Sequence, residues 1–148
     1  MRRRDIFDKP VFKLEMVLCL AWARLLISVL PFRRLRPMLG PIFEEPAAGQ
    51  APGLTAPQLK KAADTGRILH RVAGRMPFRA DCVPQALTAR WMLARRGIAT
   101  RIRIGTRRDP AQDGLQFHAW LMAGDLVVTG GQDIETYSAF GNGEQAAE

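Results

Sequence analysis

Residues 82–105, CVPQALTARWMLARRGIATRIRIG, constrain the fold of this chain more than any other segment. The first half carries apolar side chains on more than one face of a helix, which is the pattern of a helix buried at the centre of a domain. Pro84 is tolerated only in a first turn, so the helix begins at Asp81 or Cys82. Gly97 is suited to close the helix, and apolar and polar residues alternate after it, as in a half-buried strand. The segment therefore predicts a central helix followed by a strand.

Two further strands are predicted next. Residues 115–122 and 126–129 flank a tight turn at Gly124 and predict an antiparallel hairpin. Alternation of side chains puts Phe117, Ala119 and Leu121 on one face of the first strand and Gln116, His118, Trp120 and Met122 on the other. A central helix that carries a cysteine and packs on a small antiparallel sheet makes an α+β fold.

The N-terminal part is predicted to be a hydrophobic helical arm, residues 1–40. Its apolar run, residues 11–32, follows a basic cluster, but charged residues interrupt it and no small-residue cleavage site of a signal peptide follows. The longest apolar part, residues 16–32, is shorter than the roughly 20 residues of a membrane span. We expect a packed helix. Contact with a membrane surface is the open alternative, since the arginines of residues 33–36 suit an anionic surface or an acidic partner.

A linker and a second domain complete the predicted organisation. Residues 41–57 are rich in Pro, Gly and Ala, which is typical of a linker or long loop. Residues 58–148 form the domain that carries the chemistry, and its first helix begins near Pro57 and ends near Gly74.

Charge and cysteine content exclude several classes of function. The 148 residues carry a formal net charge of +8, which favours acidic partners. The basic residues are scattered and not interleaved with aromatic residues, so we expect no nucleic-acid partner. Two cysteines and two histidines at unrelated spacings predict no metal site and no cofactor, and two cysteines exclude a disulfide-dense scaffold.

Cys82 and His118 are the residues best suited to chemistry. At a helix start, unpaired backbone N–H groups and the positive end of the helix dipole favour the thiolate form of Cys82. His118 lies in the middle of a strand, and the two together have the layout of a nucleophile and its base. The same backbone amides could form part of an oxyanion hole. From spacing alone, a small buried cysteine and a core histidine stay open as alternatives.

Five motifs carry a resemblance to a known family. They are DCVPQAL at residues 81–87, LARRG at 93–97, RIRIG at 101–105, FHAWL at 117–121 and VVTGG at 127–131. In this order and at these spacings, across residues 54–140, they resemble the transglutaminase-like leader peptidases of lasso-peptide biosynthesis. The hydrophobic N-terminal helix followed by PFRR at residues 31–34 also resembles the short stand-alone members of that family.

The resemblance implies a papain-like or transglutaminase-like cysteine peptidase in the cytoplasm, with Cys82 as nucleophile and His118 as general base. The third residue of such sites is an Asp about a dozen residues past the His, where residues 128–131 have no carboxylate here. Asp133 is the predicted orienting residue and Glu135 the second choice. A backbone carbonyl or a water molecule is the remaining alternative.

Two neighbours, Trp120 and Gln85, are the predicted substrate-binding residues. Trp120 lies on the same strand face as His118 and either walls the site or packs in the core. Gln85 lies one turn into the helix and is expected to support the site. His70 and Cys19 are expected to be structural, with Cys19 far from any partner.

The implied function is removal of the N-terminal leader from a ribosomally made precursor peptide, before a separate asparagine-synthetase-like cyclase closes a macrolactam. The chain has no obvious leader-recognition domain, so we expect a separate leader-recognition protein as a partner. Two alternatives stay open. One is a transglutaminase-type acyl transferase, in which an amine captures the thioester, and the other is a non-catalytic basic module that binds a leader or a membrane.

Overall fold

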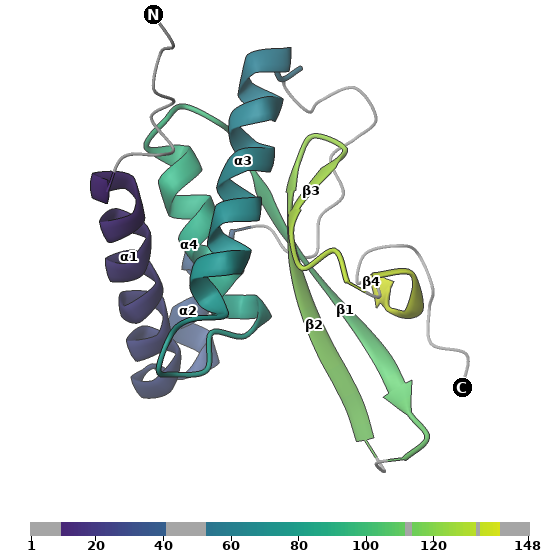
Figure 1. The fold of residues 1–148 in the computed structure, drawn as a ribbon. Coiled ribbons are helices and arrows are strands. Elements are labelled where there is room, and N and C mark those ends of the chain that lie inside the picture. Colours follow the sequence, from purple (N-terminus) through teal and green to yellow (C-terminus); the bar gives the residue numbers. More distant parts are fainter. Residues whose placement is uncertain (1–9, 41–52, 112–113, 133, 140–148) are drawn as a thin grey trace, which may run out of the picture.

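The computed structural model describes residues 10–40, 53–111, 114–132 and 134–139, and in this part of the chain the α-helices precede the strands (Figure 1). The elements are α1 (Pro10–Val29), α2 (Phe32–Leu39), α3 (Ala56–Ala73), α4 (Cys82–Ala94), β1 (Arg101–Asp109), β2 (Gly114–Ala123), β3 (Leu126–Thr129) and β4 (Ser138–Ala139). A single turn of 3-10 helix, Ile134–Thr136, precedes β4. The predicted α+β fold, with the Cys82 helix packed on a small antiparallel sheet, is confirmed.

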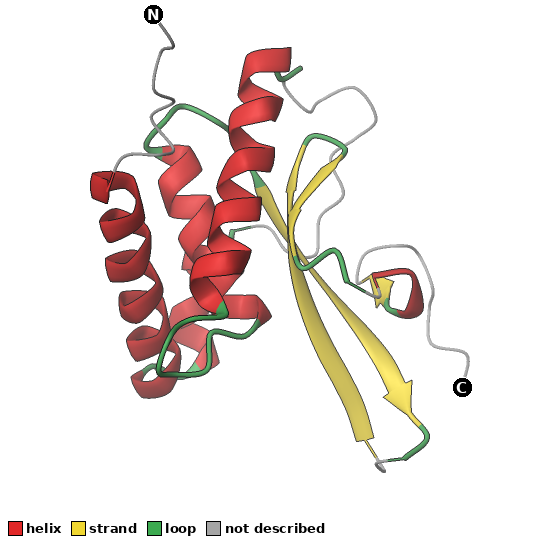
Figure 2. Cartoon of the chain, in the orientation of Figure 1, coloured by secondary structure: helices red, strands yellow, loops and turns green. Residues whose placement is uncertain are grey.

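The sheet is antiparallel, in the order β3-β2-β1-β4. The predicted hairpin of β2 and β3 is confirmed, and Gly124 takes a positive φ of 58° in its turn. Figure 2 shows that the β1–β2 hairpin extends well past the helices. Phe117 shares a face with the buried Ala119 and Leu121, yet it is 64% exposed. It lies toward the hairpin turn, where the helices no longer cover the sheet.

Helix α4 lies at the centre of the molecule. Leu87, Met92 and Leu93 are completely buried, because α1, α3 and the sheet all pack against α4. The helix begins as predicted, with Asp81 as its N-cap and Pro84 in the first turn. Gly97, with a φ of 71°, ends the turn that leads toward β1. A helix with apolar residues on more than one face therefore has neighbours on more than one face.

The N-terminal arm packs on this core. Met16 and Leu20 of α1 are completely buried in the same apolar cluster as α4. At the end of α4, Arg96 donates to Glu15 at 2.7 Å, and Arg95 lies 3.1 Å from the same carboxylate. None of the helices within the described ranges is long and apolar enough to cross a membrane.

Helix α3 follows the N-terminal arm in the chain and packs on α4 and β3. A capping box fixes its start, since the Gln58 backbone donates to the Thr55 hydroxyl and the Gln58 side chain accepts from the Thr55 backbone. Of the predicted linker at residues 41–57, residues 41–52 lie outside the described residues, and Pro57 already belongs to the first turn of α3. Gly66 in α3 packs directly against the backbone of Val128 in β3. This contact joins the helical layer to the edge of the sheet.

Candidate active site

Cys82 is the first residue of α4 and borders a pocket. The N-cap residue Asp81 makes no side-chain hydrogen bond to the helix, so side-chain capping does not occupy the first-turn amides of Cys82 and Val83. Pro84 has no N–H to satisfy. A half-buried thiol thus lies beside backbone donors at the positive end of a helix.

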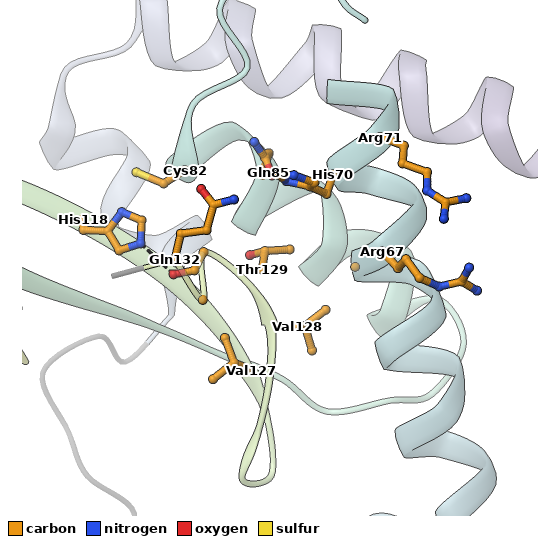
Figure 3. A pocket seen from close by; sticks show the side chains of 13 residues that line it. Arg67, His70, Arg71, Cys82, Gln85, His118, Val127, Val128, Thr129 and Gln132 are labelled. Carbon is orange, nitrogen blue, oxygen red and sulfur yellow. Dashed lines mark hydrogen bonds between the residues drawn. The ribbon is translucent and has the colours of Figure 1, made fainter. Parts of the chain in front are cut away.

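His118 lies in the middle of β2, half-buried, and its ring is fixed by a backbone oxygen. Nε2 of His118 is 2.7 Å from the carbonyl oxygen of Gly130. A carbonyl can only accept, so Nε2 carries the hydrogen in this contact and Nδ1 of the neutral ring keeps its lone pair. Figure 3 shows the Cys82 side chain on the other side of the ring from this bond.

One pocket, about 480 Å³ in volume, brings these groups together. Its wall includes Cys82 and Gln85 from α4, His118 from β2, part of α3, and the segment from Val127 to Gln132. Between Cys82 and His118, both of which the structure describes, there is no direct hydrogen bond. Pairs of this kind are often loose before substrate binds. Cys82 and His118 thus line the same pocket, as the predicted pair should.

Two aromatic rings stack on the imidazole of His118. The Trp120 ring is 6.0 Å from the imidazole and the Tyr137 ring 4.9 Å, each inclined by 28°. The guanidinium of Arg107 lies 4.7 Å from the centre of the Tyr137 ring, and Arg107 also donates to Thr136 at 3.0 Å. Stacking of this kind restricts the rotation of a ring between its neighbours.

The two predicted substrate-binding residues have different surroundings. Trp120 is only 4% exposed and packs over Gly105. The role that the structure shows for Trp120 is therefore support of the His118 ring. Gln85 lines the pocket and donates from Nε2 to the carbonyl of Ala80 at 2.7 Å, which fixes the loop just before Cys82. Contact of either residue with substrate stays a prediction.

Among the described residues, no carboxylate lies within hydrogen-bond distance of His118. Asp133 lies outside the described residues. Glu135 lies in the exposed 3-10 turn. The Gly130 carbonyl already occupies Nε2, the ring nitrogen that an orienting group would use. This bond matches one of the open alternatives from the sequence, a backbone carbonyl.

Several neighbours of the site were missed. Tyr137 is the only tyrosine of the chain, but nothing in its sequence position indicates a contact with His118. His70, expected to be structural, is exposed and lines the pocket. Cys19 was expected to lie far from any partner, and this was wrong, because Arg95 lies 3.0 Å from its sulfur across the α1–α4 contact.

The α3 side of the pocket is basic. Arg67 and Arg71 lie on its wall, and Figure 3 shows both guanidinium groups turned away from Cys82. Asp64 binds Lys60 and Arg67, each at 2.9 Å, and these hydrogen bonds hold the pKa of its carboxyl below the ordinary value. Within the described ranges, no three His, Cys, Asp or Glu side chains gather to hold a metal ion.

Comparison with protein-family models gives a match that covers most of the chain. A family model described as the transglutaminase-like superfamily matches residues 26–141, which run from the end of α1 through the whole sheet. No curated protein and no solved structure matches the chain.

Proposed function

This chain belongs to the transglutaminase-like superfamily, and from that premise we propose that it is a cysteine peptidase with Cys82 as nucleophile and His118 as general base. The observation that carries the proposal is the shared pocket, in which a thiol at a helix start and an imidazole of defined tautomer lie together. That is the arrangement by which such a base activates a thiol.

The geometry supports a two-step hydrolysis. Nδ1 of His118 takes the proton from Sγ of Cys82, and the thiolate attacks the substrate carbonyl carbon. The first-turn N–H groups of α4 can donate to the oxygen that becomes negative. The imidazolium then returns its proton to the departing amine, leaving a thioester. Water, deprotonated by the same nitrogen, hydrolyses the thioester and frees the thiol.

The backbone of Gly130 takes the orienting role in this proposal. Its carbonyl holds Nε2–H throughout the cycle, so Nδ1 is the only ring nitrogen that exchanges a proton. The site would then be a Cys–His dyad held by main chain. Asp133, the carboxylate predicted from the sequence, competes with this assignment, and replacement of each residue separates the two.

The proposed substrate is a ribosomally made lasso-peptide precursor, and the proposed reaction is removal of its leader. Support comes from the motifs around Cys82 and His118 and from the excess of positive charge, which suits an acidic leader. A separate leader-recognition protein would present the precursor, and an asparagine-synthetase-like cyclase would use the freed amine.

The test uses the purified chain, a precursor and a leader-recognition protein encoded next to it, with products identified by mass spectrometry. We expect hydrolysis at the leader–core junction, and loss of at least about three orders of magnitude in rate for Cys82→Ala and for His118→Ala. The double variant should be scarcely slower than either single one, because a nucleophile and its base act as one unit. Cys19→Ala is the matched control and should cleave normally.

Two other results would redirect the proposal. Incorporation of an added amine at the acyl group, with little hydrolysis, would identify an acyl transferase. Full biological activity of Cys82→Ala would mean that the chain is a binding module.

A substrate-independent measurement checks the pairing of thiol and base. Iodoacetamide should label Cys82 before Cys19 in the folded protein, and His118→Ala should slow the labelling of Cys82 alone. Labelling of Cys19 first, or an inert Cys82, would contradict the proposed nucleophile.

A further inference from the structure

One face of α1 is apolar and uncovered. Six large side chains on it are between 50% and 71% exposed and follow one another at spacings of three or four residues: Val11, Leu14, Leu18, Trp22, Leu25 and Val29. These spacings place all six on one side of the helix. Phe32, 55% exposed at the start of α2, extends the row. We call these seven residues the α1 stripe.

The fold does not use the α1 stripe. The other side of the same helix supplies Met16, Leu20 and Ala23, all completely buried against the core. Helix α1 is therefore apolar on two sides, and only one side is needed for folding. A row of seven exposed apolar side chains marks a surface that binds a protein or a membrane.

The charges around the α1 stripe are positive. Lys13 is exposed on α1, and Arg33, Arg34 and Arg36 are exposed on α2, directly after Phe32. Glu15, the one acidic residue in the sequence of α1 and α2, is engaged by Arg95 and Arg96. The whole chain has the same sign of charge, +8. An occupant of this surface should therefore be both apolar and anionic.

The position of α1 and the positive charges beside it favour an anionic bilayer as the occupant. Figure 1 shows α1 at the outer edge of the helical layer, and the exposed side chains of the α1 stripe follow one another along it. A row of exposed apolar side chains such as the α1 stripe can enter the interface of a bilayer, while the neighbouring arginines stay at the lipid headgroups. Trp22 and Phe32 are of the residue types found on the apolar face of helices that lie in that interface. We propose that the α1 stripe binds the surface of an anionic lipid bilayer, with α1 parallel to the membrane.

The experiment measures co-sedimentation of the full chain with vesicles. One set contains phosphatidylglycerol and phosphatidylcholine in equal amounts, and the other contains phosphatidylcholine only. We expect binding to the first set and little to the second. Leu18→Ser with Leu25→Ser should weaken binding by at least about tenfold, because apolar area is lost from the centre of the α1 stripe. Leu115→Ser with Phe117→Ser removes equally exposed apolar residues from β2 and is the matched control, which should bind normally.

The charge part has its own pair of variants. Arg33→Gln with Arg34→Gln should weaken binding by about tenfold or more, since one basic residue near an anionic surface contributes about fivefold. Arg75→Gln with Arg108→Gln removes the same charge from exposed sites elsewhere and should have a smaller effect. Trp22 fluorescence should shift to the blue on binding. Trp22→Phe should bind but lose the shift.

Several results would overturn the proposal. Absence of vesicle binding, or equal binding by the Leu18→Ser, Leu25→Ser variant with its circular dichroism unchanged, would contradict it. Self-association that this variant disperses, without vesicle binding, would assign the α1 stripe to a second copy instead. All measurements can be made in Cys82→Ala protein, so failure of the peptidase proposal leaves this test intact.

Discussion

Gly130 combines a backbone conformation that favours glycine with the contact to the proposed base. Its φ is 74°, and a Cβ there would come within 2.5 Å of the Ala119 carbonyl oxygen. Gly130→Ala should therefore displace the carbonyl from His118 and lower the cleavage rate by at least about tenfold, beyond a stability cost of about 1–2 kcal/mol for the left-handed conformation.

Gly124→Ala is the matched control for this prediction. Gly124 also has a positive φ, 58°, but a Cβ there meets nothing within 4 Å and the residue lies in the hairpin turn. The Gly124→Ala variant should lose similar stability and keep its cleavage rate.

Asp133→Asn, measured beside these variants, decides which group orients His118. A normal rate agrees with orientation by Gly130, and a tenfold loss with a normal Gly130→Ala rate would assign the role to Asp133.

Tyr137 is a positioning residue by its contact with the imidazole. Tyr137→Ala removes the ring that stacks on His118 and releases Arg107 from it, so kcat should fall several-fold with little change in KM. Tyr137→Phe keeps the ring and should restore kcat. Iodoacetamide labelling of Cys82 should slow in the Ala variant as well. Equal kcat in all three proteins would mean that the stack does not position His118.

At the scale of elements, the contact of α3 with β3 depends on Gly66. A Cβ on this residue would overlap the carbonyl of Val128, and backbone on both sides leaves no flexible group to move. Gly66→Ala should lower the free energy of unfolding by about 1–3 kcal/mol or more and deform the pocket wall. Gly74→Ala, where the nearest atom is 3.6 Å away and φ is −66°, should be neutral in the same thermal-unfolding measurement.

The contact of α1 with α4 makes stability depend on pH. The hydrogen bond from Arg96 and the charges of Arg96 and Arg95 hold the pKa of the Glu15 carboxyl below its ordinary value, against the opposing effect of partial burial. A carboxyl with a lower pKa in the folded state stabilises it above the unfolded value, about 4.3, and this contribution is lost as the pH falls through the folded value.

Glu15→Gln should therefore lower the free energy of unfolding by about 1 kcal/mol at neutral pH. The difference from wild type should close as the pH falls below about 4.3. Denaturant titrations at a series of pH values measure it, and a double-mutant cycle with Arg96→Met should show coupling of the two side chains. A pH-independent difference would place the effect of Glu15 elsewhere.

For the whole molecule, we expect the N-terminal arm to be required for the rest of the chain to fold. Phe12, Met16 and Leu20 are almost or completely buried, and burial of each contributes about 1.5–3 kcal/mol, against a total stability of about 5–15 kcal/mol for a domain. A fragment of residues 54–148 should lack a cooperative thermal transition. The full chain with Leu18→Ser and Leu25→Ser keeps the packed face and should melt near the wild-type temperature. A cooperative, wild-type transition of the fragment would show that the predicted domain is independent.

Most elements could be predicted because their signals are local. Pro84 and Gly97 mark the two ends of the α4 region, and alternation in β1 and β2 follows from the period of a strand. The position of β4 beside β1 could not be predicted, since two residues carry no periodic pattern. The exposure of Phe117 depends on how far the helices reach over the sheet, which alternation does not encode.

The site was predictable as far as residue type and order reach. Cys82 and His118 stand out because a helix start and a strand centre give a thiol and an imidazole unusual settings. The contacts of Gly130 and Tyr137 with His118 depend on chain reversals after β3, and these are set by tertiary packing. A backbone carbonyl also has no side-chain identity by which a sequence could reveal it.

The segregation of helices and strands along the chain has a consequence during synthesis. The helical layer, which ends at Ala94, emerges from the ribosome before β2 and the turn at Gly130 do. Because segments emerge in chain order during synthesis, a nascent chain of this protein would expose the Cys82 thiol with no base beside it. On the proposed chemistry, the growing polypeptide is therefore inert toward peptide bonds. The proposed peptidase activity can begin only after His118 and Gly130 have been translated and the sheet has packed on α4.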